Sequence, residues 1–269
     1  MLNRIGLYPF LIAALLQLSP VSEILAKEVA NSDCDRLAAI PGDPNLNIAG
    51  VSLNEMEHDK AIVACQDALQ SHPEQPRFAF QLARAMIAAK RPSEARKLAE
   101  FAIDDGYEIA QVVLGYLAAT GLDQDKDEVA AFDHYLRAAE AGLPLAAYVL
   151  AVRYSRGVGV NKDIEKFYQW LERAAEGNYP LAIYDLGRLY LRGDGRDKDP
   201  SKAKNLFERA AKLGVAAAHN DLGYMYQYGL GVPKDLNLAA KYYREGISKG
   251  YALSYYNYGL LLSGYGKDK

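Results

Sequence analysis

Apolar residues recur at helical spacing in pairs of short stretches along most of the chain. In residues 181–190, leucine and tyrosine recur three or four positions apart, which is the spacing of one face of an α-helix. Residues 203–211 show the same pattern. Gly193 ends the first stretch, because glycine adopts the left-handed conformation at little cost. Asp199 and Pro200 suit the start of the second helix, so the pattern predicts two helices joined by a short loop.

This pair of helices recurs every 36 residues. The first helix of each pair carries a small residue after a leucine or tyrosine, at Gly115, Ala151, Gly187, Gly223 and Gly259. The glycines that end these helices keep the same period, at Gly121, Gly157, Gly193 and Gly229. A fixed period of this length indicates a stack of like units that bury their hydrophobic faces against one another. The sequence therefore predicts an all-α solenoid of tandem helix-turn-helix repeats.

Two stretches of the repeat look like a known family. Residues 186–195 and 222–235 resemble Sel-one-like repeats, a branch of the tetratricopeptide superfamily, and the resemblance covers residues 106–266. Residues 55–105 are similar to plain tetratricopeptide helices. The resemblance implies a right-handed superhelix with a concave face. It also implies adaptor work, in envelope signalling, complex assembly or host contact. The family's cysteine-rich exported members carry a disulfide in each repeat, and these repeats contain no cysteine.

These patterns divide the chain into five segments. We expect a signal peptide, an irregular segment, tetratricopeptide-like helices, four Sel-one-like repeats, and a C-terminal capping helix with its tail, at residues 1–26, 27–54, 55–105, 106–251 and 252–269.

The N-terminus has the pattern of a secretory signal. Arg4 precedes an apolar run over residues 5–18, Pro20 interrupts it, and Ala26 offers a small residue for cleavage. An uncleaved anchor is the alternative, although the run is shorter than the ~20 residues that a spanning helix needs. We therefore expect a periplasmic or secreted protein. Cys34 and Cys65 are the only cysteines, and outside the cytoplasm we expect them to form a disulfide.

Charge and composition argue against several functions. The formal net charge is −3, so the chain has no basic excess for binding nucleic acid. The four histidines lie far apart in sequence, which argues against a metal site. The acidic stretch 123–128 lacks the glycine of a calcium loop, and we interpret it as a solvated turn. We expect no cofactor and no catalytic residues.

The first helix of each tetratricopeptide-type unit lines the concave face, which predicts a binding groove. Its residues are predominantly tyrosine and arginine, the types most often found at binding hot spots. The predicted groove residues are Tyr116, Tyr148, Arg156, Tyr184, Arg188, Arg192, Asn220, Tyr224, Gln227, Tyr228 and Tyr256. Because arginine grips carboxylates, the expected partner is a protein or peptide of acidic character.

Three hypotheses about function remain. The leading one is an exported interaction scaffold that is not an enzyme. A second is a cell-envelope hydrolase acting on cell-wall peptide or a β-lactam, which would need convergent titratable residues in the groove. A third is a structural spacer between larger partners.

The signal-peptide interpretation predicts a new N-terminus. Protein isolated from its native host should lack the first 26 residues and begin near Lys27, because signal peptidase cleaves after a small residue. Intact-mass spectrometry measures this directly. A soluble product that retains Met1 would contradict the prediction.

Overall fold

The computed structural model of the protein describes residues 32–46, 50–195 and 197–264. The predicted signal peptide lies outside these residues. All regular structure in the described part is helical, and none of these helices is long and apolar enough to cross a membrane. The α-helices are α2 (Asp33–Ala38), α3 (His58–Ser71), α4 (Pro76–Ala88), α5 (Pro92–Asp104), α6 (Gln111–Thr120), α7 (Glu128–Glu140), α8 (Pro144–Arg156), α9 (Ile164–Glu176), α10 (Pro180–Arg192), α11 (Pro200–Lys212), α12 (Ala216–Tyr228), α13 (Leu236–Ser248) and α14 (Ala252–Leu262). A 3₁₀ turn, η1 (Glu108–Ala110), precedes α6.

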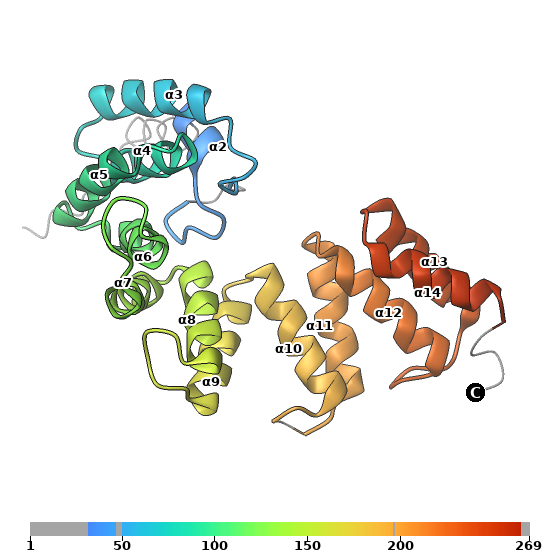
Figure 1. Ribbon diagram of the computed structural model, residues 1–269. Coiled ribbons are helices and arrows are strands. Elements are labelled where there is room, and N and C mark those ends of the chain that lie inside the picture. The colour runs from blue at the N-terminus through green and yellow to red at the C-terminus, as the bar shows by residue number, and fades with distance from the viewer. Residues whose placement is uncertain (1–31, 47–49, 196, 265–269) are drawn as a thin grey trace, which may run out of the picture. The chain divides into compact units, whose positions relative to one another are not determined.

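Each helix packs against the next along the chain, so the stack grows one pair at a time (Figure 1). We call α4, α6, α8, α10, α12 and α14 the first helices, and α5, α7, α9, α11 and α13 the second helices. Each second helix contacts the first helix of the following pair, as α9 contacts α10, and this links the pairs. The first helices α12 and α14 are also in contact. The prediction of an all-α solenoid is confirmed.

The loops between helices follow from two residue types. Glycines that end first helices have left-handed backbones, with φ of 69° at Gly121 and 79° at Gly193. Aspartates begin the second helices, and the side chain of Asp127 accepts hydrogen bonds from the backbone N–H groups of Val129 and Ala130. The Asp163, Asp199 and Asp235 carboxylates do the same in the later units. The acidic stretch at 123–128 therefore ends in a helix cap.

The small residue of the first helix lies against an aromatic ring of the second helix. A Cβ atom at Gly187 would stand 2.8 Å from the Phe207 ring, and one at Gly223 would stand 2.7 Å from the Tyr243 ring. Overpacking a core in this way costs about 1–3 kcal/mol. The repeated small residue therefore sets how closely the two helices approach.

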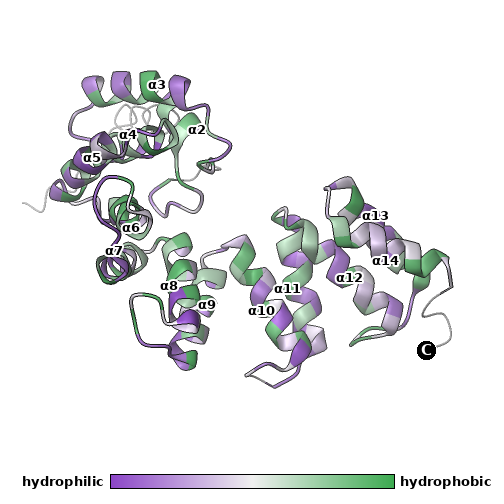
Figure 2. Ribbon diagram, in the orientation of Figure 1, coloured by the Kyte–Doolittle hydropathy of each residue, from purple (hydrophilic) through white to green (hydrophobic). Residues whose placement is uncertain are grey.

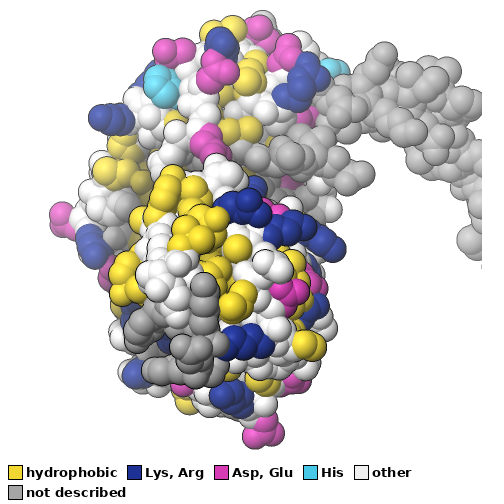
Figure 3. Space-filling model, turned by 90° about the vertical axis from the view of Figure 1, so that its right-hand side faces the viewer, with side chains coloured by type: hydrophobic (Ala, Val, Ile, Leu, Met, Phe, Trp, Pro, Cys, Tyr) yellow, Lys and Arg dark blue, Asp and Glu magenta, His cyan; other side chains and the backbone are white. Residues whose placement is uncertain are grey.

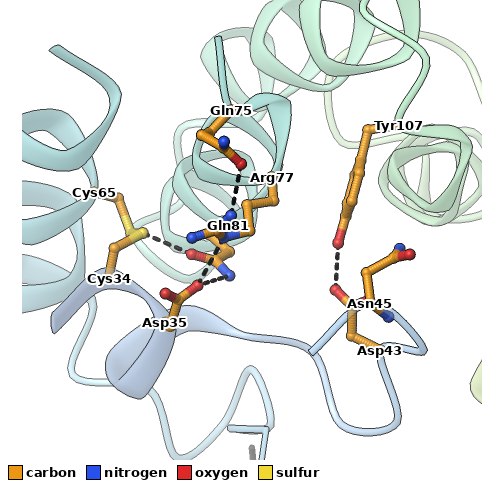
Figure 4. A network of polar contacts seen from close by, with 9 residues as sticks. All are labelled: Cys34, Asp35, Asp43, Asn45, Cys65, Gln75, Arg77, Gln81 and Tyr107. Carbon is orange, nitrogen blue, oxygen red and sulfur yellow. Dashed lines mark hydrogen bonds and ion pairs between the residues drawn. A yellow bond between two sulfur atoms is a disulfide. The ribbon is translucent and has the colours of Figure 1, made fainter. Parts of the chain in front are cut away.

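A disulfide fastens the irregular N-terminal segment to the first helices. Cys34 on α2 is bonded to Cys65 on α3, with a Cα–Cα distance of 4.6 Å (Figure 4). The buried Asp35 carboxylate accepts a hydrogen bond from Gln81 Nε2 at 2.8 Å and faces Arg77 Nε at 3.3 Å. The predicted disulfide is confirmed, and a buried polar network accompanies it.

The same segment is fastened again near residue 43. Tyr107 Oη donates a hydrogen bond to the Asp43 carboxylate, and burial together with that carboxylate raises the pKa of Tyr107 (Figure 4). The Arg84 guanidinium on α4 donates to the carbonyl oxygens of Ala38 and Val51. Burial lowers the pKa of Arg84 to about 10. Ala38 and Val51 are therefore both held against α4.

Removing the disulfide should destabilise this N-terminal part. The cysteines are 31 residues apart, and closing a loop of that length is worth ~3–4 kcal/mol in the chain-entropy model. The variant Cys34→Ser with Cys65→Ser should therefore melt at a lower temperature in circular dichroism, and reduced wild-type protein should match it. Equal melting temperatures for the oxidised wild type and the variant would contradict this.

Candidate functional site

Side-chain hydrogen bonds join successive first helices. Tyr148 Oη on α8 donates to Asp185 Oδ2 on α10 at 2.9 Å. One repeat later, Tyr184 Oη on α10 donates to Asp221 Oδ2 on α12 at 3.0 Å. The partners are 37 residues apart in both cases. Each tyrosine therefore bonds to the residue directly after its own equivalent position in the next repeat. We call these bonds, with the one described next, the polar ladder.

The ladder continues with amides at the C-terminal end. Asn257 Nδ2 on α14 donates to Asn220 Oδ1 on α12 at 2.8 Å, and Asn220 Nδ2 also donates to Asp221 Oδ1 at 3.1 Å. Asn220 lies one repeat after Tyr184, and Asn257 lies one repeat after Asp221. Asn220 is buried, so its amide serves the contact between repeats.

Burial changes the titration of the ladder carboxylates. It raises the pKa of Asp185 and Asp221, while the tyrosine hydrogen bonds and the charge of Arg188 act in the opposite direction. Burial and the neighbouring carboxylates also raise the pKa of Tyr148 and Tyr184. Since both aspartates lie among the predicted groove arginines, this surface is less positive than the sequence pattern suggested.

The three predicted groove arginines differ in their surroundings. Arg188 is partly engaged: its Nη1 lies 4.0 Å from Asp185 Oδ1, and its guanidinium lies 5.7 Å from the Tyr184 ring centroid. Arg156 and Arg192 are exposed at the ends of α8 and α10. Of the three predicted groove arginines, only Arg156 and Arg192 are therefore exposed.

The predicted groove tyrosines also differ in exposure. Tyr224 and Tyr256 are exposed, and the Tyr224 and Tyr228 rings lie 4.6 Å apart between centroids. Tyr116 is half-buried on α6. Gln227 differs from its expected place, because it is buried and its Oε1 accepts a hydrogen bond from Tyr243 Oη at 2.7 Å. Gln227 and Asn220 therefore serve packing between helices.

A cavity of about 850 Å³ lies over the N-terminal first helices. Its floor comes from α4, α6 and α8, and residues 40–41 and 52–54 form a wall. Figure 2 shows α6 hydrophobic over most of its length. The lining residues are Ile40, Pro41, Ser52, Leu53, Asn54, Arg84, Ile87, Ala88, Lys90, Pro92, Val112, Val113, Tyr116, Leu122, Tyr135, Leu145, Val149 and Tyr179. Most of these side chains are aliphatic or aromatic, which suits an apolar ligand group.

The cavity and the polar ladder use equivalent positions of successive repeats. Val113 and Val149, which line the cavity, stand two residues before the small residue of their helices. Asp185 and Asp221 occupy that position in the next two repeats. The first-helix face, by which we mean the surface carrying this position, therefore changes from apolar at α6 and α8 to polar at α10 and α12.

Sequence reasoning missed the cavity for a physical reason. Its wall is irregular chain without helical periodicity, and nothing local shows that Ile40, Pro41 and Leu53 cover α4 and α6. The one feature of the sequence that pointed to the cavity was the change from Val149 to Asp185 at the same repeat position. Among the described residues, no cluster of histidine, cysteine, aspartate or glutamate could hold a metal ion.

The polar ladder predicts opposite effects for two conservative substitutions. Tyr184→Phe leaves the half-buried Asp221 carboxylate without its tyrosine donor and should cost about 1 kcal/mol. Asp221→Asn keeps an acceptor and removes a half-buried charge, so the melting temperature should stay equal or rise. The raised pKa of Asp221 gives the sign with pH: its contribution favours folding at low pH and is lost as pH rises through the folded-state pKa.

Melting curves of wild type and both variants from pH 4 to 8 measure these effects. The Asp221→Asn gain over wild type should be larger at pH 8 than at pH 4. A loss of stability in Asp221→Asn equal to that of Tyr184→Phe would contradict the argument.

Comparison with known families locates the repeats. The Sel1 repeat matches residues 109–143, 144–179, 180–215 and 216–251, and a tetratricopeptide repeat matches residues 54–103. The boundaries coincide with the first and second helices of α6 to α13, and the tetratricopeptide match covers α3 to α5. No match is found among the curated proteins.

Solved structures of the same fold resemble this chain. A Sel1 repeat protein from Oxalobacter formigenes is 34% identical, with 67% of this chain and 74% of that chain covered and a TM-score of 0.63. The protein c5321, a protective antigen present in uropathogenic Escherichia coli strains displaying an SLR fold, is 27% identical with a TM-score of 0.66. That match covers 76% of this chain and 44% of the antigen, so this chain spans less than half of the antigen's length. With four matched repeats over more than half of its residues, the chain belongs to the Sel1 repeat family.

Proposed function

We propose that the protein is an exported scaffold that binds a peptide or protein segment along the first-helix face. The apolar part of the segment enters the cavity over α4, α6 and α8. The acidic part runs past Arg156 and Arg192. The observation that carries the proposal is that one face has an apolar cavity at its N-terminal end and the exposed Arg156 and Arg192 at the ends of α8 and α10.

The size and lining of the cavity support a ligand with large apolar side chains. Ligand pockets commonly have volumes of about 300–1,000 Å³ and a few polar groups among apolar walls. This cavity has about 850 Å³, with Arg84 and Lys90 among its lining residues. Arg84 already donates hydrogen bonds to two backbone carbonyl groups. Lys90 is therefore the lining cation that is available to orient the ligand.

The fold supports protein recognition in general terms. Sel1 repeats are a scaffold fold typical of protein–protein interaction. The disulfide between Cys34 and Cys65 is compatible with export, since disulfides persist in oxidising compartments. The predicted signal peptide, residues 1–26, would direct this export. A role in envelope signalling or complex assembly would follow from such a location.

The ladder tyrosines fit binding better than hydrolysis. The raised pKa of Tyr148 and Tyr184 makes their hydroxyl groups weaker nucleophiles and weaker acids at neutral pH. Both hydroxyl groups also donate hydrogen bonds to aspartates of the next repeat. The scaffold hypothesis is therefore the one that the geometry of this face favours over a hydrolase.

Two exposed arginines test the charged end of the face. We expect Arg156→Ala with Arg192→Ala to weaken partner binding roughly tenfold or more, because each truncated hot-spot arginine costs about 1 kcal/mol or more. The measurement is recovery of crosslinked partner from the native envelope, followed by titration of the identified segment. Arg173→Ala with Arg244→Ala, which removes two exposed arginines from second helices, is the charge-matched control.

A second variant tests the apolar end. Val149→Glu places a carboxylate in the cavity floor and should weaken binding at every salt concentration, because burying an unpaired charge is costly. The loss in the arginine variant should instead shrink as salt rises, because salt screens exposed charges. Full partner recovery by both variants, with helical content intact, would move the interface away from the first-helix face.

A further inference from the structure

The outer face of α14 is apolar and exposed. It consists of Ala252, Tyr255, Tyr256, Gly259 and Leu262, which recur at the three- and four-residue spacing of one helix face. Figure 3 looks onto the end of the molecule where α13 and α14 lie in Figure 1, and shows hydrophobic side chains gathered there. The opposite side of α14 covers the fourth repeat, where Leu261 packs with Tyr243 and Ala239.

Two positions of this face are far more exposed than their equivalents in the third repeat. Tyr255 is 58% exposed, whereas Ile183, two repeats before it, is 0% exposed. Leu262 is 65% exposed, whereas Tyr190 is 8% exposed at the equivalent place. In that repeat the second helix covers this face. On α14 the described residues leave it uncovered, whereas a terminal repeat normally has a polar outer face.

Gly259 marks the centre of the uncovered face. Gly187 and Gly223, at the same repeat position, each lie against an aromatic ring of the second helix. At Gly259 a Cβ atom would meet no described atom within 4 Å. The helix therefore presents a socket for a large side chain.

We propose that the occupant of this face is α14 of a second copy of the chain. Consider a two-fold axis that is perpendicular to α14 and passes beside its outer face at the level of Asn257, so that the two helices pack antiparallel. Tyr255 then lies opposite Gly259 of the other copy, and Leu262 lies opposite Ala252. Both contacts pair a large side chain with a small one, and each occurs twice because the axis repeats it. The face carries both the knob and the socket that a symmetric contact requires.

Charge also favours a second copy. An interface between identical surfaces places like charges together unless the surface is neutral. The sequence of α14, Ala-Leu-Ser-Tyr-Tyr-Asn-Tyr-Gly-Leu-Leu-Leu, contains no charged residue, so self-association brings no repulsion along the helix. The contact also continues the solenoid's own packing, since a helix again covers the face that second helices cover in α8, α10 and α12.

The test measures the oligomeric state of the full chain by sedimentation velocity over a wide range of concentrations. We expect a monomer–dimer equilibrium for the wild type. Tyr255→Glu should weaken the dimer at least tenfold, because it places a charge at the centre of an apolar contact. Leu262→Glu is the second variant in case Tyr255→Glu fails to fold. Val129→Glu, which changes an exposed apolar residue on α7, is the matched control and should leave the dimer unchanged.

A size exchange tests the register of the contact. Tyr255→Ala alone removes the knob, and Gly259→Tyr alone fills the socket, so each should weaken the dimer. The double variant restores a large residue opposite a small one and should recover dimerisation relative to both single variants. Circular dichroism verifies that each variant keeps its helical content.

Three results would overturn the proposal. A wild type that stays monomeric at all concentrations would leave the face for a different partner. Open-ended oligomers would indicate head-to-tail stacking rather than a two-fold contact. A dimer that tolerates Tyr255→Glu and Leu262→Glu, or a double variant no better than the weaker single one, would place the interface elsewhere.

Discussion

The structure depends on close packing between helix pairs, in which a glycine on α6, α10 or α12 lies against the ring of Tyr135, Phe207 or Tyr243 on the following helix. At Gly187 and Gly223 the space for even a Cβ atom is absent, so the ring of Phe207 or Tyr243 fixes the separation and rotation of the pair. That geometry turns the remaining faces of both helices toward the neighbouring pairs. A single pair cannot bury these faces alone, so stability comes from stacking. By the same reasoning, the outer face of α14, which no described residue covers, presents apolar area that a partner can bury.

The sequence was sufficient to predict the repeats because their determinants are local. Spacing of apolar residues, glycines such as Gly193 and caps such as Asp199 each act within a few positions, and the 36-residue period multiplies the signal. The disulfide was also predictable, because Cys34 has only Cys65 as a partner. The cavity was not, since its wall depends on contacts between Arg84 and the carbonyl groups of residues 38 and 51, which no local pattern records.

The site residues illustrate the same division. Repeat spacing placed Tyr148 and Tyr184 at equivalent positions of successive repeats, but it did not reveal that each donates to an aspartate of the next repeat. A tyrosine hydroxyl engaged in this way stabilises the stack and offers a partner chiefly its ring. Gln227 has the spacing of a groove residue, yet its amide accepts from the Tyr243 hydroxyl within the fourth repeat. Side chains of one periodic series can thus serve either packing or recognition, and the difference depends on which neighbours supply hydrogen-bond partners.

The N-terminal segment connects the redox environment to the proposed recognition site. Ile40, Pro41 and Leu53 form one wall of the cavity, and they belong to chain without helical structure of its own. The disulfide joins α2 before that segment to α3 after it. Arg84 donates hydrogen bonds to Ala38 and Val51, and Tyr107 donates one to Asp43. In a reducing compartment the first of these attachments would be missing, and the wall would rest on the hydrogen bonds alone. The cavity is therefore best formed where the disulfide persists, which joins the proposed export of the protein to the proposed binding of its partner.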